Sequence, residues 1–167
     1  MTSFYDVINA IKTYLEGNNS VSTVTFGDLL EVDLNKQTIF PLSHLTVRDV
    51  SFSDHVMTFT VNVMALDIVE ETKENNKEQT EPFYGSNNKQ DVLNTQLMVL
   101  NGLQSSLRRG GLFQQDFVVD GDLTASLVEG RFENLLVGWE MNITLEVPND
   151  SIMDINDKLT EDETVEL

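Results

Sequence analysis

The sequence predicts an α+β fold: a single mixed or antiparallel, strongly twisted β-sheet with two main α-helices packed on one face. Three observations predict this class. Residues 135–147 form one long strand pattern, residues 45–68 form a hairpin, and two amphipathic helical patterns occupy residues 3–17 and 91–109. One sheet with both helices on a single face accounts for this order of elements.

The sheet is organised around residues 135–147, read as LLVGWEMNITLEV. This alternation is typical of a strand with one buried face and one face in water. Thirteen extended residues span about 43 Å, whereas the expected radius of gyration is about 15 Å. The strand is therefore either the spine of a coiled sheet or an arm, and we expect one end to meet a neighbouring subunit. The apolar positions are Leu135, Val137, Trp139, Met141, Ile143, Leu145 and Val147.

Both predicted helices carry an apolar stripe and recognisable ends. Gly17 ends the first helix. Asp91 suits the start of the second helix, Arg108 and Arg109 suit its end, and Gly102 allows close packing on the sheet. The stripes consist of Phe4, Val7, Ile8, Ile11 and Leu15 in the first helix, and of Leu93, Leu97, Leu100, Leu103 and Leu107 in the second, with Val92 and Val99 beside it.

Shorter strand patterns lie on either side of the hairpin. Residues 21–26 predict a strand, Leu30, Val32 and Leu34 alternate as another, and residues 38–40 form a third run that Pro41 ends. Residues 117–128 predict a strand that pairs antiparallel with residues 135–147 through a turn at residues 129–131. Its inward positions are Val119, Leu123, Ala125 and Leu127.

The hairpin at residues 45–68 turns at Ser53-Asp54-His55. One face of its second strand consists of Met57, Phe59, Val61, Val63 and Ala65. The opposite face begins with Thr58, Thr60 and Asn62, but it continues with Met64, Leu66 and Ile68. Because this end is apolar on both sides, we expect a helix or another subunit to cover it.

Two polar segments interrupt or follow the domain. Residues 70–90 form a loop longer than most, so we expect it to be either functional or mobile. Its adjacent aromatics, Phe83 and Tyr84, are a candidate docking point for a partner. We therefore divide the chain into an α+β domain at residues 1–148 and a mobile, acidic C-terminal tail at residues 149–167.

Composition and charge argue against several classes of function. The chain has 10 basic and 28 acidic residues, a net charge of −18, which repels phosphate backbones and anionic lipid. With no cysteine, it has no disulfides, thiolate metal sites or thiol nucleophiles, which suits a reducing cytoplasm. Neither a signal-peptide pattern nor an apolar run of about 20 residues is present, so no membrane partner is expected.

The sequence predicts no catalytic, cofactor-binding or metal-ligating residues, and we expect the protein not to be an enzyme. The two histidines, His44 and His55, are not accompanied by a GxSxG motif, so a hydrolase is a distant alternative. Asp120-Gly121-Asp122 resembles the start of a calcium loop, but Ala125 and Arg131 occupy the positions where an EF-hand needs glycine and an acid. A turn or the edge of a strand is the favoured interpretation.

Two segments resemble the tail-terminator and neck-protein family of tailed bacteriophages. They are residues 24–71, VTFGDLLEVDLNKQTIFPLSHLTVRDVSFSDHVMTFTVNVMALDIVEE, and residues 91–110, DVLNTQLMVLNGLQSSLRRG. The resemblance covers roughly residues 4–147. It lies in the order of elements, in the FPLSHL segment that enters a long hairpin, and in the helix that follows. These are patterns of structure and not catalytic signatures.

The resemblance implies a structural virion protein, a subunit of a homo-oligomeric ring of six or twelve copies at the head–tail junction. Such a ring joins the tail to the head connector, and genomic DNA passes through it without specific binding. The implied partners are other copies and other neck, connector and tail-tube proteins, and no cofactor is implied. The implied location is the virion, after assembly in the cytoplasm of the host bacterium. The excess negative charge suits a channel through which DNA slides.

We expect subunit or partner contacts in three places: the polar loop, the apolar end of the hairpin and the end of the second helix. Arginines at a helix C-terminus are also explained by the helix dipole alone. The alternative function is a soluble, non-catalytic protein- or ligand-binding module that uses the loop at residues 70–90. The expected contact residues are Phe83, Tyr84, Met64, Leu66, Ile68, Arg108 and Arg109.

Overall fold

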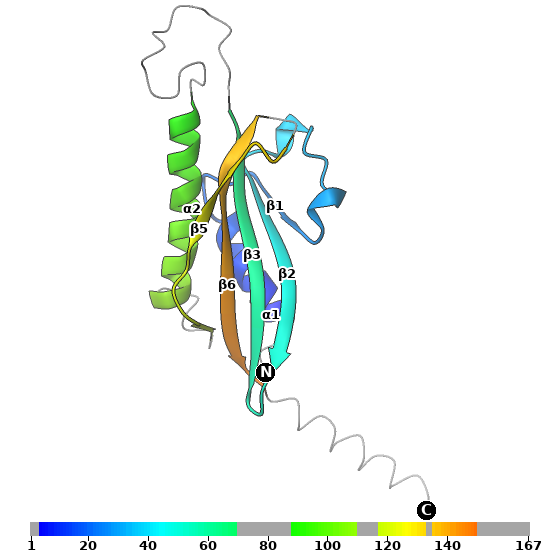
Figure 1. Cartoon of the computed structure of the whole chain (residues 1–167), viewed down its shortest axis with the longest axis vertical. Helices are drawn as coiled ribbons and strands as arrows, with labels where there is room; N and C mark the ends of the chain where they lie inside the picture. The colour runs from blue at the N-terminus through cyan, green and yellow to red at the C-terminus, as the bar shows by residue number, and fades with distance from the viewer. Residues whose placement is uncertain (1–3, 70–87, 110–116, 133–134, 150–167) are drawn as a thin grey trace, which may run out of the picture.

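The computed structural model describes residues 4–69, 88–109, 117–132 and 135–149. Within them, one mixed six-stranded sheet carries two α-helices on one face, which confirms the predicted α+β class (Figure 1). No helix in this part of the chain is long and apolar enough to cross a membrane. The elements are α1 (Phe4–Glu16), β1 (Thr23–Phe26), the 3₁₀ helices η1 (Leu29–Glu31) and η2 (Gln37–Ile39), β2 (Leu42–Phe52), β3 (Val56–Ile68), α2 (Lys89–Arg109), β4 (Val118–Val119), β5 (Ala125–Glu129) and β6 (Leu136–Pro148).

β3 and β6 form the centre of the sheet. Both strands have 13 residues and pair antiparallel along their whole length, from Val56 opposite Pro148 to Ile68 opposite Leu136. β2 is antiparallel to β3, with the predicted hairpin turn between them, and β1 is parallel to the first residues of β2. β4 and β5 are both antiparallel to β6. The pairing of β5 with β6 was predicted from the sequence.

Both edges of β6 are occupied within the chain. β3 lies along one edge, and β5 and β4 lie along parts of the other. Between β4 and β5, the Asp120 N–H donates a hydrogen bond of 2.9 Å to the Thr144 carbonyl. These pairings confirm that β6 is the spine of the sheet. Its length therefore gives no reason to place one end in a neighbouring subunit.

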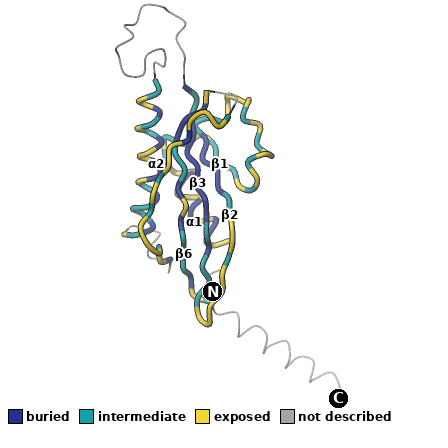
Figure 2. Tube along the Cα trace, in the orientation of Figure 1, coloured by how far each residue is buried: buried dark blue, intermediate teal, exposed yellow. Residues whose placement is uncertain are grey.

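The main core lies between the helices and one face of the sheet, where Figure 2 shows the buried residues along β3 and β6. The predicted alternation holds in both strands, because side chains of odd-numbered residues face the helices. Complete burial of each large aliphatic side chain contributes about 1.5–3 kcal/mol of transfer free energy. The buried odd-numbered positions are Phe59, Val61, Val63 and Ala65 in β3, and Met141, Ile143, Leu145 and Val147 in β6.

The buried face of α2 differs from the predicted leucine stripe. Leu100, Leu103 and Leu107 are buried as expected, but Leu97 is 38% exposed and Gln96 is completely buried. Leu97 lines a groove between α2 and the segment that joins β4 to β5. Periodicity of leucines could not reveal the change, because a buried glutamine gives no apolar signal.

Gly102 brings the two helices together and does not serve the predicted packing on the sheet. A Cβ atom on Gly102 would lie 2.4 Å from the Tyr14 hydroxyl of α1. Burial also raises the pKa of Tyr14 above its ordinary value, so this phenol is neutral at physiological pH. Glycine is required here for close approach of a side chain and not for a turn.

The strand predictions for Leu30–Leu34 and residues 38–40 are wrong. Leu29–Glu31 is a 3₁₀ helix in which Asp28 accepts a hydrogen bond of 2.9 Å from the Leu30 N–H, and Gln37–Ile39 is a second 3₁₀ helix. Asp33 similarly accepts from the Asn35 N–H. Aspartate side chains that bond to the backbone two residues later favour turns over strand ladders.

The predicted strand at residues 117–128 is divided into β4 and β5. The chain turns between them at Gly121, whose φ of 71° lies in the left-handed region that favours glycine. Ala125 packs at the edge of the main core, but Leu127, predicted to be inward, is 46% exposed. Residues 120–122 form a bend between two short edge strands, which agrees with the turn or strand-edge interpretation.

We predict that Gly138→Ala destabilises the fold by about 2 kcal/mol or more. A Cβ atom at Gly138 would lie 1.9 Å from the Ala65 carbonyl oxygen on β3, and neither backbone can move without breaking the central ladder. The free energy of urea unfolding measures the effect. Gly17→Ala is the matched control, because its Cβ has no contact closer than 3.4 Å and we expect a change within about 0.5 kcal/mol. Equal stability of the two variants would contradict the prediction.

Candidate functional site

The face of the sheet that points away from the helices carries a groove of about 830 Å³, which we call the open-face groove. One wall is the corner after β1, at Phe26–Leu29, and the other is the turn after β5, at Arg131 and Phe132. Its floor consists of residues from β2, β3 and β6, including Asn62 and Glu140. α1 lies behind the sheet in Figure 1, so this groove opens toward the viewer.

The apolar end of the hairpin is covered by this same chain. Met64 is 5% exposed and Leu66 is completely buried, in a small cluster with Val128. Leu29, Phe40 and Phe132 pack on this cluster. Met64 and Leu66 therefore do not offer the predicted contact surface, and the cover is neither a neighbour nor an α-helix. Ile68, the third expected residue, is half-buried.

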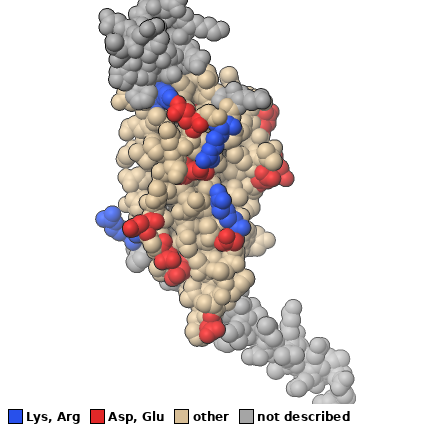
Figure 3. Space-filling model, in the orientation of Figure 1, with Lys and Arg blue, Asp and Glu red and all other residues tan. Residues whose placement is uncertain are grey.

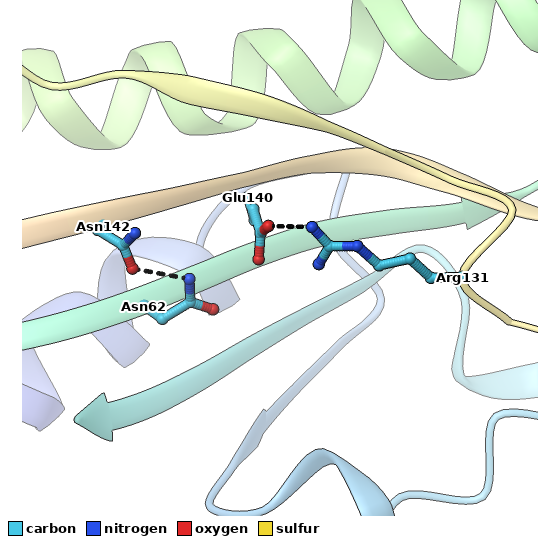
Figure 4. A network of polar contacts seen from close by, with 4 residues as sticks. All are labelled: Asn62, Arg131, Glu140 and Asn142. Carbon is cyan, nitrogen blue, oxygen red and sulfur yellow. Dashed lines mark hydrogen bonds and ion pairs between the residues drawn. The ribbon is translucent and has the colours of Figure 1, made fainter.

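A short polar network crosses the groove floor (Figure 4). Arg131 forms an ion pair with Glu140, and the Asn62 side-chain amide donates a hydrogen bond of 2.9 Å to Oδ1 of the Asn142 side chain. The hydrogen bond from Arg131 lowers the pKa of Glu140, with smaller contributions from Asn62 and from the charge of Arg48. Near neutral pH, Glu140 is therefore an ionised carboxylate whose charge is balanced by Arg131, and it is not a proton donor.

Arg48 gives the groove an exposed cationic side chain. It lies at the irregularity in β2 where the pairing with β3 shifts between Val47 and Asp49. Among the described residues, it forms no ion pair closer than 4.0 Å. The guanidinium of Arg131 is also partly exposed, with 48% of its side chain accessible, whereas only 16% of the Glu140 side chain is accessible. The positive charges therefore point outward from the floor.

His44 anchors the corner that forms one wall of the groove. It is completely buried, with Nδ1 2.7 Å from the Thr25 hydroxyl and Nε2 2.9 Å from the Gly27 carbonyl oxygen. Since a carbonyl only accepts, Nε2 carries the proton and Nδ1 accepts from Thr25. Both ring nitrogens are used in structural bonds. His55 lies exposed in the hairpin turn, beyond the opposite end of β2 from His44.

The predicted arginines at the end of α2 line a second groove of about 470 Å³, beside β5. Arg108 donates a hydrogen bond to the Gly121 carbonyl oxygen, so it holds the turn between β4 and β5. Arg109 is exposed. Of the two, only Arg109 has a surface position suited to an anionic partner. Phe83 and Tyr84 lie outside the described residues.

Sequence reasoning missed the open-face groove because its residues come from distant segments. Arg48, Asn62, Arg131 and Glu140 belong to four different strands or turns. The polar positions of β3 and β6 were visible as an alternation. A register that places Asn62 opposite Asn142 would have revealed the network, but register cannot be read from one strand alone.

A scan against protein-family models and a search of curated proteins both find no match. The class that the fold and site define is therefore an α+β domain with an open, grooved sheet face. The bacteriophage resemblance stays a prediction.

We predict that His44 makes stability depend on pH. Burial lowers the pKa of His44 below its ordinary value of 6.5, so the unfolded chain binds a proton at a higher pH than the folded chain does. The stabilisation is complete above about pH 7 and decreases as the pH falls through about 6.5 toward the folded pKa. Urea unfolding at a series of pH values measures this slope.

The glutamine variant His44→Gln keeps a donor and an acceptor but cannot titrate. We expect it to lose less stability than the wild type between about pH 7.5 and about pH 5.5. His55→Gln makes the same substitution at the exposed turn histidine and serves as the comparison for a site that is not buried. Identical slopes for the wild type and His44→Gln would contradict the role assigned to His44.

Proposed function

We propose that this chain is a structural virion protein, a subunit of an oligomeric ring at the head–tail junction of a tailed bacteriophage. In this role it joins the tail to the head connector and surrounds the passage for DNA. The resemblance of residues 24–71 and 91–110 to the tail-terminator and neck-protein family supports the location. The arrangement of the two outer edges of the sheet is the observation that supports a ring.

Both edges of the sheet have backbone available for a further strand. β1 covers β2 only at residues 42–45, so residues 46–52 of β2 pair with no second strand among the described residues. At the opposite edge, β4 and β5 pair with β6 and with no other described strand. Unpaired N–H and C=O groups at such edges readily accept a strand from another chain.

The directions of these edges favour contact between unlike edges. β2, β3 and β6 alternate in direction, and β4 and β5 are antiparallel to β6, so β2 runs opposite to β4 and β5. If a second copy is rotated about an axis parallel to the strands, its β2 meets β4 or β5 of the first copy in antiparallel orientation. A contact of this head-to-tail kind repeats and forms a ring when the rotation closes.

Exposed apolar side chains accompany both edges. On the β2 side, Phe52 is 73% exposed and Phe26 is 48% exposed, and on the opposite side Val118 and Leu127 are 51% and 46% exposed. Contact between the two edges would remove these side chains from water, which contributes about 25 cal/mol per Å² of apolar surface. The net charge of −18 also supports passage of DNA without adhesion.

The alternative, a soluble binding module, is favoured by the open-face groove on a single copy. The loop that it was expected to use lies outside the described residues. The two functions differ in one simple respect: the module acts as a monomer, whereas the ring requires self-association through the sheet edges.

We predict that Phe52→Glu and Val118→Glu each prevent ring formation, because each places a negative charge at one of the two edges. In native mass spectrometry at high protein concentration, we expect a closed ring for the wild type and a monomer for each variant. In an equimolar mixture of the two variants, the intact β2 edge of one variant can meet the intact β4/β5 edge of the other. Both remaining edges of that dimer are substituted, so we expect dimers and nothing larger. Leu30→Glu is the control, since Leu30 is 92% exposed on η1 and belongs to none of the strands β2, β4 and β5, and this variant should still form rings.

A wild-type protein that remains monomeric, or a Val118→Glu variant that assembles normally, would contradict the edge contact.

The location requires a separate test. A cryo-electron microscopy map of the assembled phage particle should show density for this chain as a ring between head and tail. Density for the chain elsewhere, or its absence from the particle, would contradict the proposed function.

A further inference from the structure

The open-face groove combines an apolar wall with a basic side chain, that of Arg48, which forms no ion pair among the described residues. Its lining holds two basic and two acidic residues: Glu140 pairs with Arg131, and Asp28 keeps its charge while it accepts a hydrogen bond from the Leu30 N–H. Arg48 is exposed, and Arg131 retains donors beyond those directed at Glu140. Figure 3 shows this face of the molecule, where basic and acidic side chains alternate down the middle. The groove is thus suited to an acidic segment that also carries apolar side chains.

We propose that the occupant of the open-face groove is the C-terminal segment of the same chain, residues 150–167. This segment contains seven acidic residues and one lysine, so its charge is complementary to Arg48, and Arg131, which is paired with Glu140, can offer its remaining N–H donors. Charge-assisted hydrogen bonds between a guanidinium and a carboxylate are stronger than neutral ones. Apolar residues are interspersed among the acids, and they match the walls at Phe26 and Phe132; they are Ile152, Met153, Ile155, Leu159, Val165 and Leu167.

The length of the segment permits docking within one molecule. The chain leaves the sheet at Asn149, whose N–H donates a hydrogen bond of 2.9 Å to the His55 carbonyl beside the hairpin turn. From His55 to Asn62, on the groove floor, β3 advances seven residues, which is roughly 23 Å. About seven extended residues cover this distance, so the cluster Glu161-Asp162-Glu163 lies well within reach. This proposal does not depend on the ring.

The absence of cysteine makes a site-specific test straightforward. A nitroxide spin label on a Thr160→Cys variant of the full chain, labelled uniformly with ¹⁵N, broadens amide signals near the segment. We expect a loss of signal intensity at Thr46, Arg48 and Asn62, and retained intensity around Lys12 on α1, on the opposite side of the sheet. Raising the salt concentration should restore the signals in the groove, because exposed charges are screened.

Arg48→Glu in the labelled chain should abolish the loss of intensity in the groove. Lys12→Glu makes the same change of charge on α1 and should leave the loss in place. The proposal is overturned if broadening is equal on both faces of the sheet, or if Arg48→Glu has no effect in a chain whose spectrum shows it folded. Docking from a second copy is detected by mixing ¹⁵N-labelled chains that carry no nitroxide with chains that carry the nitroxide but no ¹⁵N. Broadening of the groove signals in that mixture would also overturn docking within one molecule.

Discussion

The antiparallel ladder between β3 and β6 is the interaction on which the rest of the structure depends. It joins strands of equal length, separated by more than 60 residues in the sequence, over all 13 positions. One side of the ladder is apolar along its length, so it forms the floor on which α1 and α2 pack. Closing the long connection between the strands costs conformational entropy, which the burial of this face offsets.

The same ladder positions both regions to which we assign a role. Because side chains alternate across a strand, the register that buries Val63 and Met141 also places Asn62 beside Asn142 and Glu140 on the opposite face. The ladder also fixes the directions of β2, β4 and β5, which flank it. The groove and the two edges are therefore consequences of one register. A shift by a single residue would move the polar network into the core.

Strong periodicity made the centre of this fold predictable, and local hydrogen bonding made its periphery unpredictable. The alternation at residues 135–147 and in β3 gave the correct strands, faces and hairpin. Leu30–Leu34 alternates as well, but Asp28 and Asp33 bond to nearby backbone N–H groups and stabilise turns instead. Gln96 is a different case: it is polar, but it is buried because it lies on the same face of α2 as buried apolar residues. The groove required knowledge of which segments meet, and no single segment carries that information.

Amide hydrogen exchange tests the central claim most directly. If the β3–β6 ladder supports the whole fold, its amides should exchange only through global unfolding and should be the slowest in the protein, with a free energy equal to that of urea unfolding. Faster exchange, through local unfolding, is expected for two groups of amides. They are the amides of the η1 and η2 segments and the amides of β2 that face outward. Exchange in β3 or β6 that is as fast as in these peripheral segments would contradict the account.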